Sequence, residues 1–195
     1  MLKASLVALL SLLTCACGKV TSASEKAMPA STNITLLGQT YHLGSFNQKV
    51  KPTWEFVTGT ETVDNWTTLV TLIDRPDAPT RPDLDRLAEG IMANYKSHAA
   101  QILMAKTFPN SPSGAYNYMA SAFEEPAQHR FELNFVKMAM GPKNAYVVIY
   151  GARVTDPQNY LRMGKDYLNQ HSGEIGDALE KFALPDLTAL PRKEF

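Results

Sequence analysis

Apolar and polar positions along the chain follow two different periods, and these predict an order of strands and helices. Residues 61–74 crowd β-branched and large apolar side chains between polar turn residues, which is typical of a strand. In a two-residue repeat its apolar side chains fall on both sides, with Trp66, Val70 and Leu72 on one and Leu69 and Ile73 on the other. The pattern predicts a central strand that is covered on both faces.

Further strands are predicted before and after this central strand. Residues 34–43 alternate and are interrupted at Gly38, which indicates a short strand pair, and residues 53–58 form a better strand that turns antiparallel to the central one. Later runs at 115–124, 129–140 and 145–150 predict an antiparallel meander. Within 129–140 the apolar phase changes after Phe135, which predicts a β-bulge.

Two longer stretches repeat every three or four residues and predict helices. Thr80 fits an N-cap with Asp83 at the capping-box position, and an apolar stripe follows over residues 81–106. Gly90 inside this helix costs about 1 kcal/mol relative to alanine, and a close approach of the helix to the sheet would explain it. Asp156 before a proline starts the second helix, which runs to Phe182 unless the glycines near its middle break it, and the tail after it is expected to be loosely held.

Length and composition predict one domain that does not bind nucleic acid. The chain has 195 residues, 45% of them hydrophobic, which suits one sizeable core. Lysine and arginine number 19, as do aspartate and glutamate, so the summed charge favours neither nucleic acid nor an anionic membrane surface. Cys15 and Cys17 are the only cysteines, so the rest of the chain has no disulfide, cysteine zinc site or cysteine nucleophile.

The first residues combine a basic start, an apolar run and a cysteine. Lys3 precedes the apolar residues 6–13, which are too few to span a bilayer, since that takes about 20, but suit the h-region of a signal peptide. Small residues then lead into Cys17, with Ala16 before it and Gly18 after it. On these residues the segment resembles a bacterial lipoprotein precursor, whose signal peptide ends at a lipobox cysteine.

The resemblance implies an acylated Cys17 at the mature N-terminus and therefore a membrane anchor. Several acyl chains anchor a protein stably, because each buried CH₂ contributes about 0.8 kcal/mol. Gly18 is not the aspartate that marks inner-membrane retention in enterobacterial lipoproteins, so the resemblance points to the outer membrane. Two alternatives stay open: Cys15, with Leu12 three residues ahead, as the acylated residue, or an ordinary cleaved signal with incidental cysteines.

These observations divide the chain into three parts. Residues 1–16 are the expected signal peptide, residues 17–32 the lipidated cysteine and a flexible tether, and residues 33–195 a single α+β domain. A tether of this length spans on the order of 20 Å, so the domain can stand off the membrane. We expect a periplasm-facing protein of the bacterial cell envelope.

The predicted fold class is α+β, with a mostly antiparallel sheet covered by two long helices. About five to six strands are expected, in the order β-β-β-α-β-β-β-α. This order resembles the α-β-α sandwich of the PsbP/DcrB type, a group that includes small secreted and lipidated bacterial proteins. The resemblance implies a binding or assembly module rather than a particular ligand.

Signatures of catalysis, metal binding and cofactor binding are missing from the sequence. The four histidines are far apart, and no His-Glu-x-x-His, Gly-x-Ser-x-Gly, Walker or dinucleotide motif occurs. We therefore predict no cofactor and no enzyme activity. The alternative is an enzyme whose site is assembled from distant residues, the candidates being His98, His129, Glu124 and Asp74.

Aromatic residues supply the candidate contact surface for a protein partner in the periplasm. Trp and Tyr are enriched at interface hot spots, and a polar turn precedes Trp66. The candidate residues are Trp54, Asp64, Asn65, Trp66, Tyr116 and Tyr118. Core packing of the four rings is the alternative explanation.

The first functional hypothesis is a non-catalytic lipoprotein that binds a protein, for example as an immunity or inhibitor protein or as a secretion-system accessory. The second is a carrier of a small apolar or lipidic ligand between helix and sheet, because methionines suit adaptable pockets. The methionines concerned are Met92, Met104, Met119, Met138 and Met140.

Overall fold

A computed structural model describes residues 32–192, in which eight strands and two long helices are formed. In chain order the elements are β1 (Asn33–Leu36), β2 (Gln39–Asn47), β3 (Thr53–Thr58), β4 (Thr68–Arg75), α2 (Arg81–Ser97), β5 (Gln101–Phe108), β6 (Tyr116–Glu125), the 3-10 helix η2 (Pro126–Gln128), β7 (Arg130–Met140), β8 (Ala145–Thr155) and α3 (Tyr160–Lys181). Cys17 and the expected signal peptide lie outside the described residues.

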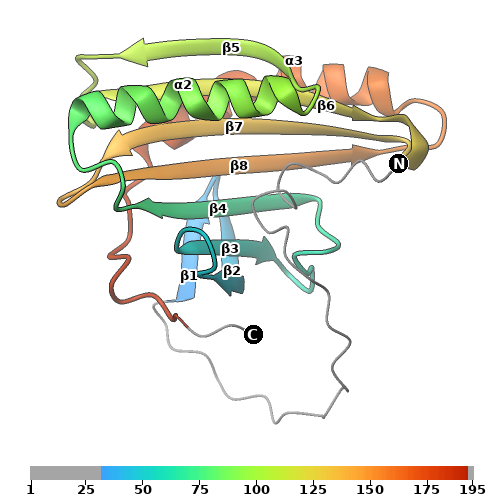
Figure 1. Cartoon of the computed structure of the whole chain (residues 1–195). Coiled ribbons are helices and arrows are strands. Elements are labelled where there is room, and N and C mark those ends of the chain that lie inside the picture. The colour runs from blue at the N-terminus through green and yellow to red at the C-terminus, as the bar shows by residue number, and fades with distance from the viewer. Residues whose placement is uncertain (1–31, 193–195) are drawn as a thin grey trace, which may run out of the picture.

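All the strands belong to one antiparallel sheet. Their order across the sheet is β1-β2-β3-β4-β8-β7-β6-β5, so the chain builds one half, crosses over through α2 and returns from the opposite edge. Helix α2 lies on one face of the sheet and α3 on the other (Figure 1). The architecture is thus a sheet between two layers of helix.

The predicted strand number and element order are wrong, because two strands were missed. The strand pair indicated at 34–43 is the hairpin of β1 and β2, whose turn at Leu37 and Gly38 has positive φ at both residues, but the predicted element order counted it as one strand. The predicted helix 81–106 ends at Ser97, and its last part is the edge strand β5. Ala99 ends this helix in the left-handed region, a place where glycine is the usual signal.

The predicted start of α2 is confirmed. The Thr80 side chain accepts a hydrogen bond from the Asp83 N–H, and the Asp83 carboxylate accepts one from the Thr80 N–H at 3.0 Å. Helix α3 begins later than predicted, at Tyr160, because the Asp156 carboxylate accepts the N–H of Gln158 in a turn ahead of the helix. The glycines near its middle do not break it.

The predicted β-bulge in β7 is also wrong. Strand β7 pairs with β6 and β8 without a register shift, so its apolar residues on both phases reflect burial on both faces. Leu133 and Phe135 pack beneath α3, whereas Val136 and Met138 pack beneath α2. Apolar residues on both phases are expected of a strand covered from both sides.

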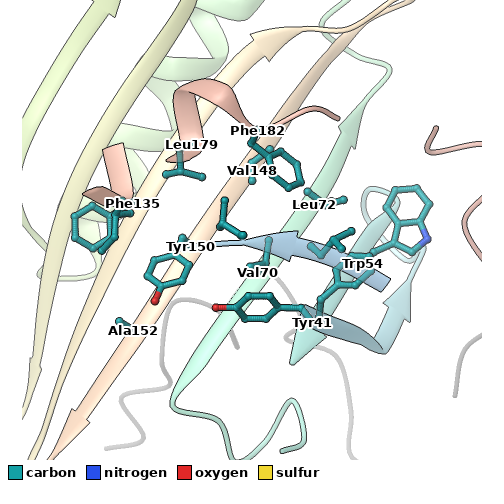
Figure 2. Packing of buried hydrophobic residues seen from close by; sticks show 14 of the residues in the cluster. Tyr41, Trp54, Val70, Leu72, Phe135, Val148, Tyr150, Ala152, Leu179 and Phe182 are labelled. Atoms are coloured by element: carbon teal, nitrogen blue, oxygen red, sulfur yellow. The ribbon is translucent and has the colours of Figure 1, made fainter. Parts of the chain in front are cut away.

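The core on the α3 face extends from β7 and β8 to the far strands of the sheet. Phe135, Val148 and Tyr150 lie below α3, and Val70, Leu72 and Trp54 continue the same layer (Figure 2). The tail after α3 completes this layer: Leu190 is buried, and the Pro191 carbonyl accepts a 2.8 Å hydrogen bond from the Trp54 indole. The prediction of a loosely held tail is therefore wrong for residues up to Arg192.

Glycines in the helices have different surroundings. A Cβ at Gly164 in α3 would overlap the Phe131 ring, so α3 and β7 approach more closely there than any side chain allows. A Cβ at Gly90 in α2 would meet no atom within 4 Å. The explanation predicted for Gly90, close contact with the sheet, is wrong, and it applies to Gly164 instead.

We expect Gly164→Ala to lower the free energy of unfolding by roughly 1–3 kcal/mol, because the added methyl group forces α3 away from Phe131. Gly90→Ala should instead raise it by up to about 1 kcal/mol, because the methyl group stays in open space and removes a helical glycine. Urea denaturation of both variants measures the difference. Equal stabilities would contradict the close contact between α3 and β7.

Candidate binding site

The edge strand β5 is the most exposed long strand of the sheet. It pairs with β6 on one side, and no described strand pairs with its other side. Most of its residues are exposed or half-buried, and Met104 is 42% exposed. In Figure 1 this strand forms the upper border of the sheet, above α2. Its outer N–H and C=O groups are available for hydrogen bonds.

The two helices are displaced sideways relative to each other. Helix α2 packs on β5, β6 and β7, whereas α3 packs mainly on β7 and β8. On the α3 face, the outer strip of the sheet therefore extends past the helix. A groove therefore lies between α3 and the exposed face of β5 and β6.

This hollow, which we call the edge groove, has a volume of about 410 Å³. It is lined by Leu103, Met104 and Phe108 of β5, by Tyr116, Tyr118 and Ala120 of β6, and by Leu168, Asn169, Ser172, Gly173, Gly176, Asp177 and Glu180 of α3. The sheet supplies an apolar floor, and α3 supplies a wall of small and acidic residues.

A bulge in β5 turns two neighbouring side chains towards the edge groove. The pairing of β5 with β6 shifts register between Ile102 and Met104, which leaves Leu103 as the extra residue. Leu103 and Met104 both line the groove, although neighbours in a regular strand would point to opposite faces. The bulge thus adds apolar surface to the floor.

The wall of the edge groove contains two glycines that the packing of the domain does not require. A Cβ at Gly173 would meet no atom within 4 Å, and a Cβ at Gly176 would make only an ordinary contact, 3.8 Å from the Tyr118 hydroxyl oxygen. Each glycine costs the helix about 1 kcal/mol relative to alanine. Because these two glycines have no side chains, the groove stays open beside them.

The floor of the edge groove is built from stacked and buried aromatic rings. Phe108 and Tyr116 stack with their ring centroids 4.7 Å apart. Burial raises the pKa of Tyr118 to about 12. Burial also raises the pKa of Tyr116, and the negative charges of Glu180 and Asp177 raise it further. Both phenols are therefore neutral in the folded protein at physiological pH.

One end of the edge groove is acidic. Asp177 is exposed and makes no hydrogen bond or ion pair within residues 32–192 that would neutralise it. The Glu180 carboxylate accepts a 2.6 Å hydrogen bond from Ser111, and the Glu180 carbonyl accepts one of 2.8 Å from the buried Lys137. Burial lowers the pKa of Lys137. No cation is among the residues that line the groove.

The structure brings two of the predicted contact residues together and separates the others. Tyr116 and Tyr118 lie in the floor of the edge groove. Trp54 is buried under the C-terminal tail, on the same face but far across the sheet (Figure 2). Its ring is fully buried, so it presents no contact surface.

The remaining candidates lie around Trp66, on the α2 face. The sequence pattern placed Trp66 with Val70 and Leu72, but it packs with Leu69 on the opposite face, and the Arg153 guanidinium lies 3.7 Å from the centre of its ring. Trp66 is buried, whereas Asp64 and Asn65 before it are exposed. All four rings are buried, as the core-packing alternative expects, and they do not gather on one surface.

Most of the edge groove was not predicted as a site. Gly173, Gly176, Asp177 and Glu180 were missed, and Met104 was predicted only for the carrier hypothesis. Helical glycines without a packing partner are the one signal in the sequence, but it can be interpreted only when the neighbouring atoms are known.

Two further hollows bear on the alternative hypotheses. A hollow of about 320 Å³ between α2 and the sheet is lined by Met92, Met119 and Met138, and it is open to solvent rather than enclosed. A larger one of about 770 Å³ lies between the β7–β8 turn and the tail and contains Asp74, without His98, His129 or Glu124. Neither hollow brings together two of the residues proposed for an assembled enzyme site.

Metal ligands and membrane-spanning helices were sought in residues 32–192. No group of three or more histidine, cysteine, aspartate or glutamate side chains in this range could hold a metal ion. None of the helices in the same range is long and apolar enough to cross a membrane.

No protein-family model matches the chain, and no curated protein sequence matches it.

We expect the domain to lose stability above about pH 10, where unfolded tyrosines ionise. Tyr118 and other buried tyrosines keep their protons to higher pH when folded, so the folded state binds more protons and the free energy of unfolding falls as pH rises. Each such group contributes about 1.4 kcal/mol per pH unit. The lowered pKa of Lys137 acts in the opposite direction, but it is one group against several.

Urea denaturation between about pH 9 and about pH 11 measures this slope. Tyr118→Phe, which cannot ionise, should reduce the slope by the contribution of one group. A free energy of unfolding that does not change over this range would contradict the burial of these phenols.

Proposed function

We propose that the domain is a non-catalytic binding module of the bacterial cell envelope, and that an extended segment of a partner protein binds along β5 with side chains in the edge groove. The observation that carries this proposal is the pair of glycines, Gly173 and Gly176, in the wall of the groove. Nothing in the packing of the domain needs them, yet both keep the same hollow open.

The cost of these glycines favours a function over chance. Two helical glycines cost α3 about 2 kcal/mol relative to alanine, a large part of the stability of a typical domain. Residues that break a local rule without any gain in packing are expected at functional sites. A side chain inserted from outside would fill the space beside Gly173.

The unpaired edge of β5 favours an extended segment over other shapes of ligand. A peptide that adds to a sheet edge gains main-chain hydrogen bonds, and its alternate side chains enter pockets on the sheet face. Strand β5 offers such an edge directly beside the edge groove. The charge of the groove favours a segment that is apolar and basic, because Asp177 and Glu180 are its only charged lining residues.

The envelope location rests on the lipoprotein-like start of the sequence. Acylation at Cys17 would fasten the chain to the membrane, and the tether would let the domain meet a partner in the periplasm. An immunity or inhibitor protein, or an accessory protein of a secretion system, would both bind a partner in this way.

We expect Gly173→Leu to weaken binding of the natural partner by about tenfold or more, which is ~1.4 kcal/mol, because the new side chain occupies the edge groove. The measurement is quantitative crosslinking and recovery of partner proteins from envelope extract, with the variant beside the unaltered chain. The matched control is Gly90→Leu, which also adds leucine at an exposed helical glycine in open space but lies outside the groove.

Proteins recovered equally with both variants do not use the edge groove. If every crosslinked protein behaves in this way, the proposed function is wrong. Recovery that falls for Gly173→Leu and stays unchanged for Gly90→Leu supports it.

We expect labelling with palmitate to depend on Cys17. The unaltered chain and Cys15→Ala should take up label, and Cys17→Ala should not, because the thiol at residue 17 is the expected acylation site. Gel fluorography of the purified protein reads the result. Loss of label only in Cys15→Ala would assign the anchor to Cys15, and an unlabelled chain would indicate an ordinary secreted protein.

A further inference from the structure

The acidic end of the edge groove lies at a definite distance from its glycine wall. Gly173 and Asp177 are separated by four residues of α3, which corresponds to about 6 Å along a helix. Side chains two residues apart on one face of a strand are separated by about 6.6 Å. A strand added to β5 would therefore present one side chain near Gly173 and the next on the same face near Asp177.

The register of the sheet supports this arrangement. Gly176 lies against Tyr118, which pairs with Lys106 of β5, whereas the charges of Glu180 and Asp177 act on Tyr116, which pairs with Phe108 two residues further along β5. The Glu180 carboxylate also accepts a hydrogen bond from Ser111, in the loop that follows β5. Helix α3 thus crosses from the glycine wall to the acidic end within the length of β5. The open part of the groove and its acidic part follow each other along the path of an added strand.

The charges around this end leave Asp177 available for a cation. Lys137 is buried and donates to the Glu180 carbonyl, so its ammonium group is already committed within the domain. The Glu180 carboxylate is bound by Ser111. Lys106 is exposed on β5 between Met104 and Phe108, and Lys181 lies four residues after Asp177 in α3. Neither lysine makes an ion pair with Asp177 within the described chain. Asp177, at the exposed rim, has no such partner within the described chain.

On the basis of the proposed function, we infer that the edge groove selects a partner segment in which a large apolar residue and a lysine or arginine are two positions apart. The apolar side chain fills the space beside Gly173, over the floor of Leu103, Tyr118 and Ala120. The basic side chain reaches Asp177 at the rim. A segment with an acidic residue at the second position is rejected, because like charges would face each other.

A selection from a random heptapeptide display library tests this inference. The target is the full mature protein in detergent, and Asp177→Lys is selected in parallel. For the unaltered protein we expect peptides with an apolar residue and a basic residue two positions apart to be enriched about tenfold over the starting library. Asp177→Lys should lose the basic preference and enrich an acidic residue at the same position.

The matched control is Glu174→Lys, which makes the same change of charge on α3 but lies outside the edge groove. It should select the same peptides as the unaltered protein. Apolar peptides enriched without any basic preference would overturn the inference and leave the proposed function standing. Peptides that are enriched equally on Gly173→Leu would show that the groove is not used, which overturns the proposed function itself.

Discussion

The fold depends on the need to cover two strands, β7 and β8, on both of their faces. Val147 and Ile149 point to the α2 side and Val148 and Tyr150 to the α3 side, so neither face of these strands can be left in water. One helix on each side satisfies this need. At Gly164 the backbone of α3 lies directly against the Phe131 ring of β7, with no room for a side chain between them. The two-sided apolar core therefore sets where both helices lie.

The sideways displacement of the helices then decides what remains uncovered. Helix α2 reaches β5, and α3 stops short of it, so the same strand is supported on one face and open on the other. Natural sheets protect such edges with charges and bulges, and β5 has both, an exposed Lys106 and the register shift at Leu103. These features disfavour pairing of β5 with arbitrary strands, whereas a segment whose side chains fit the edge groove would gain additional contacts there.

The sequence was informative where structure is determined locally and uninformative where it is determined by packing. The capping box of Thr80 and Asp83 and the turn at Gly38 were predictable, because neighbouring residues decide them. The end of α2 was not, since Ala99 takes a left-handed conformation without a glycine signal and the apolar spacing continues into β5. The edge groove could not be predicted at all, because it arises from the relative position of α3 and β5, which are far apart in the chain.

The width of the edge groove is held by contacts that join its two sides. Ser111, in the loop between β5 and β6, donates to the Glu180 carboxylate of α3, and Lys137 of β7 donates to the carbonyl of the same residue. Glu180 is thus bound from the edge of the sheet and from its centre at once. Because a buried ammonium group needs its acceptor, α3 cannot move away from β7 without leaving Lys137 unpaired. Because these contacts already fix the groove in the free protein, binding a ligand costs little conformational entropy for ordering it.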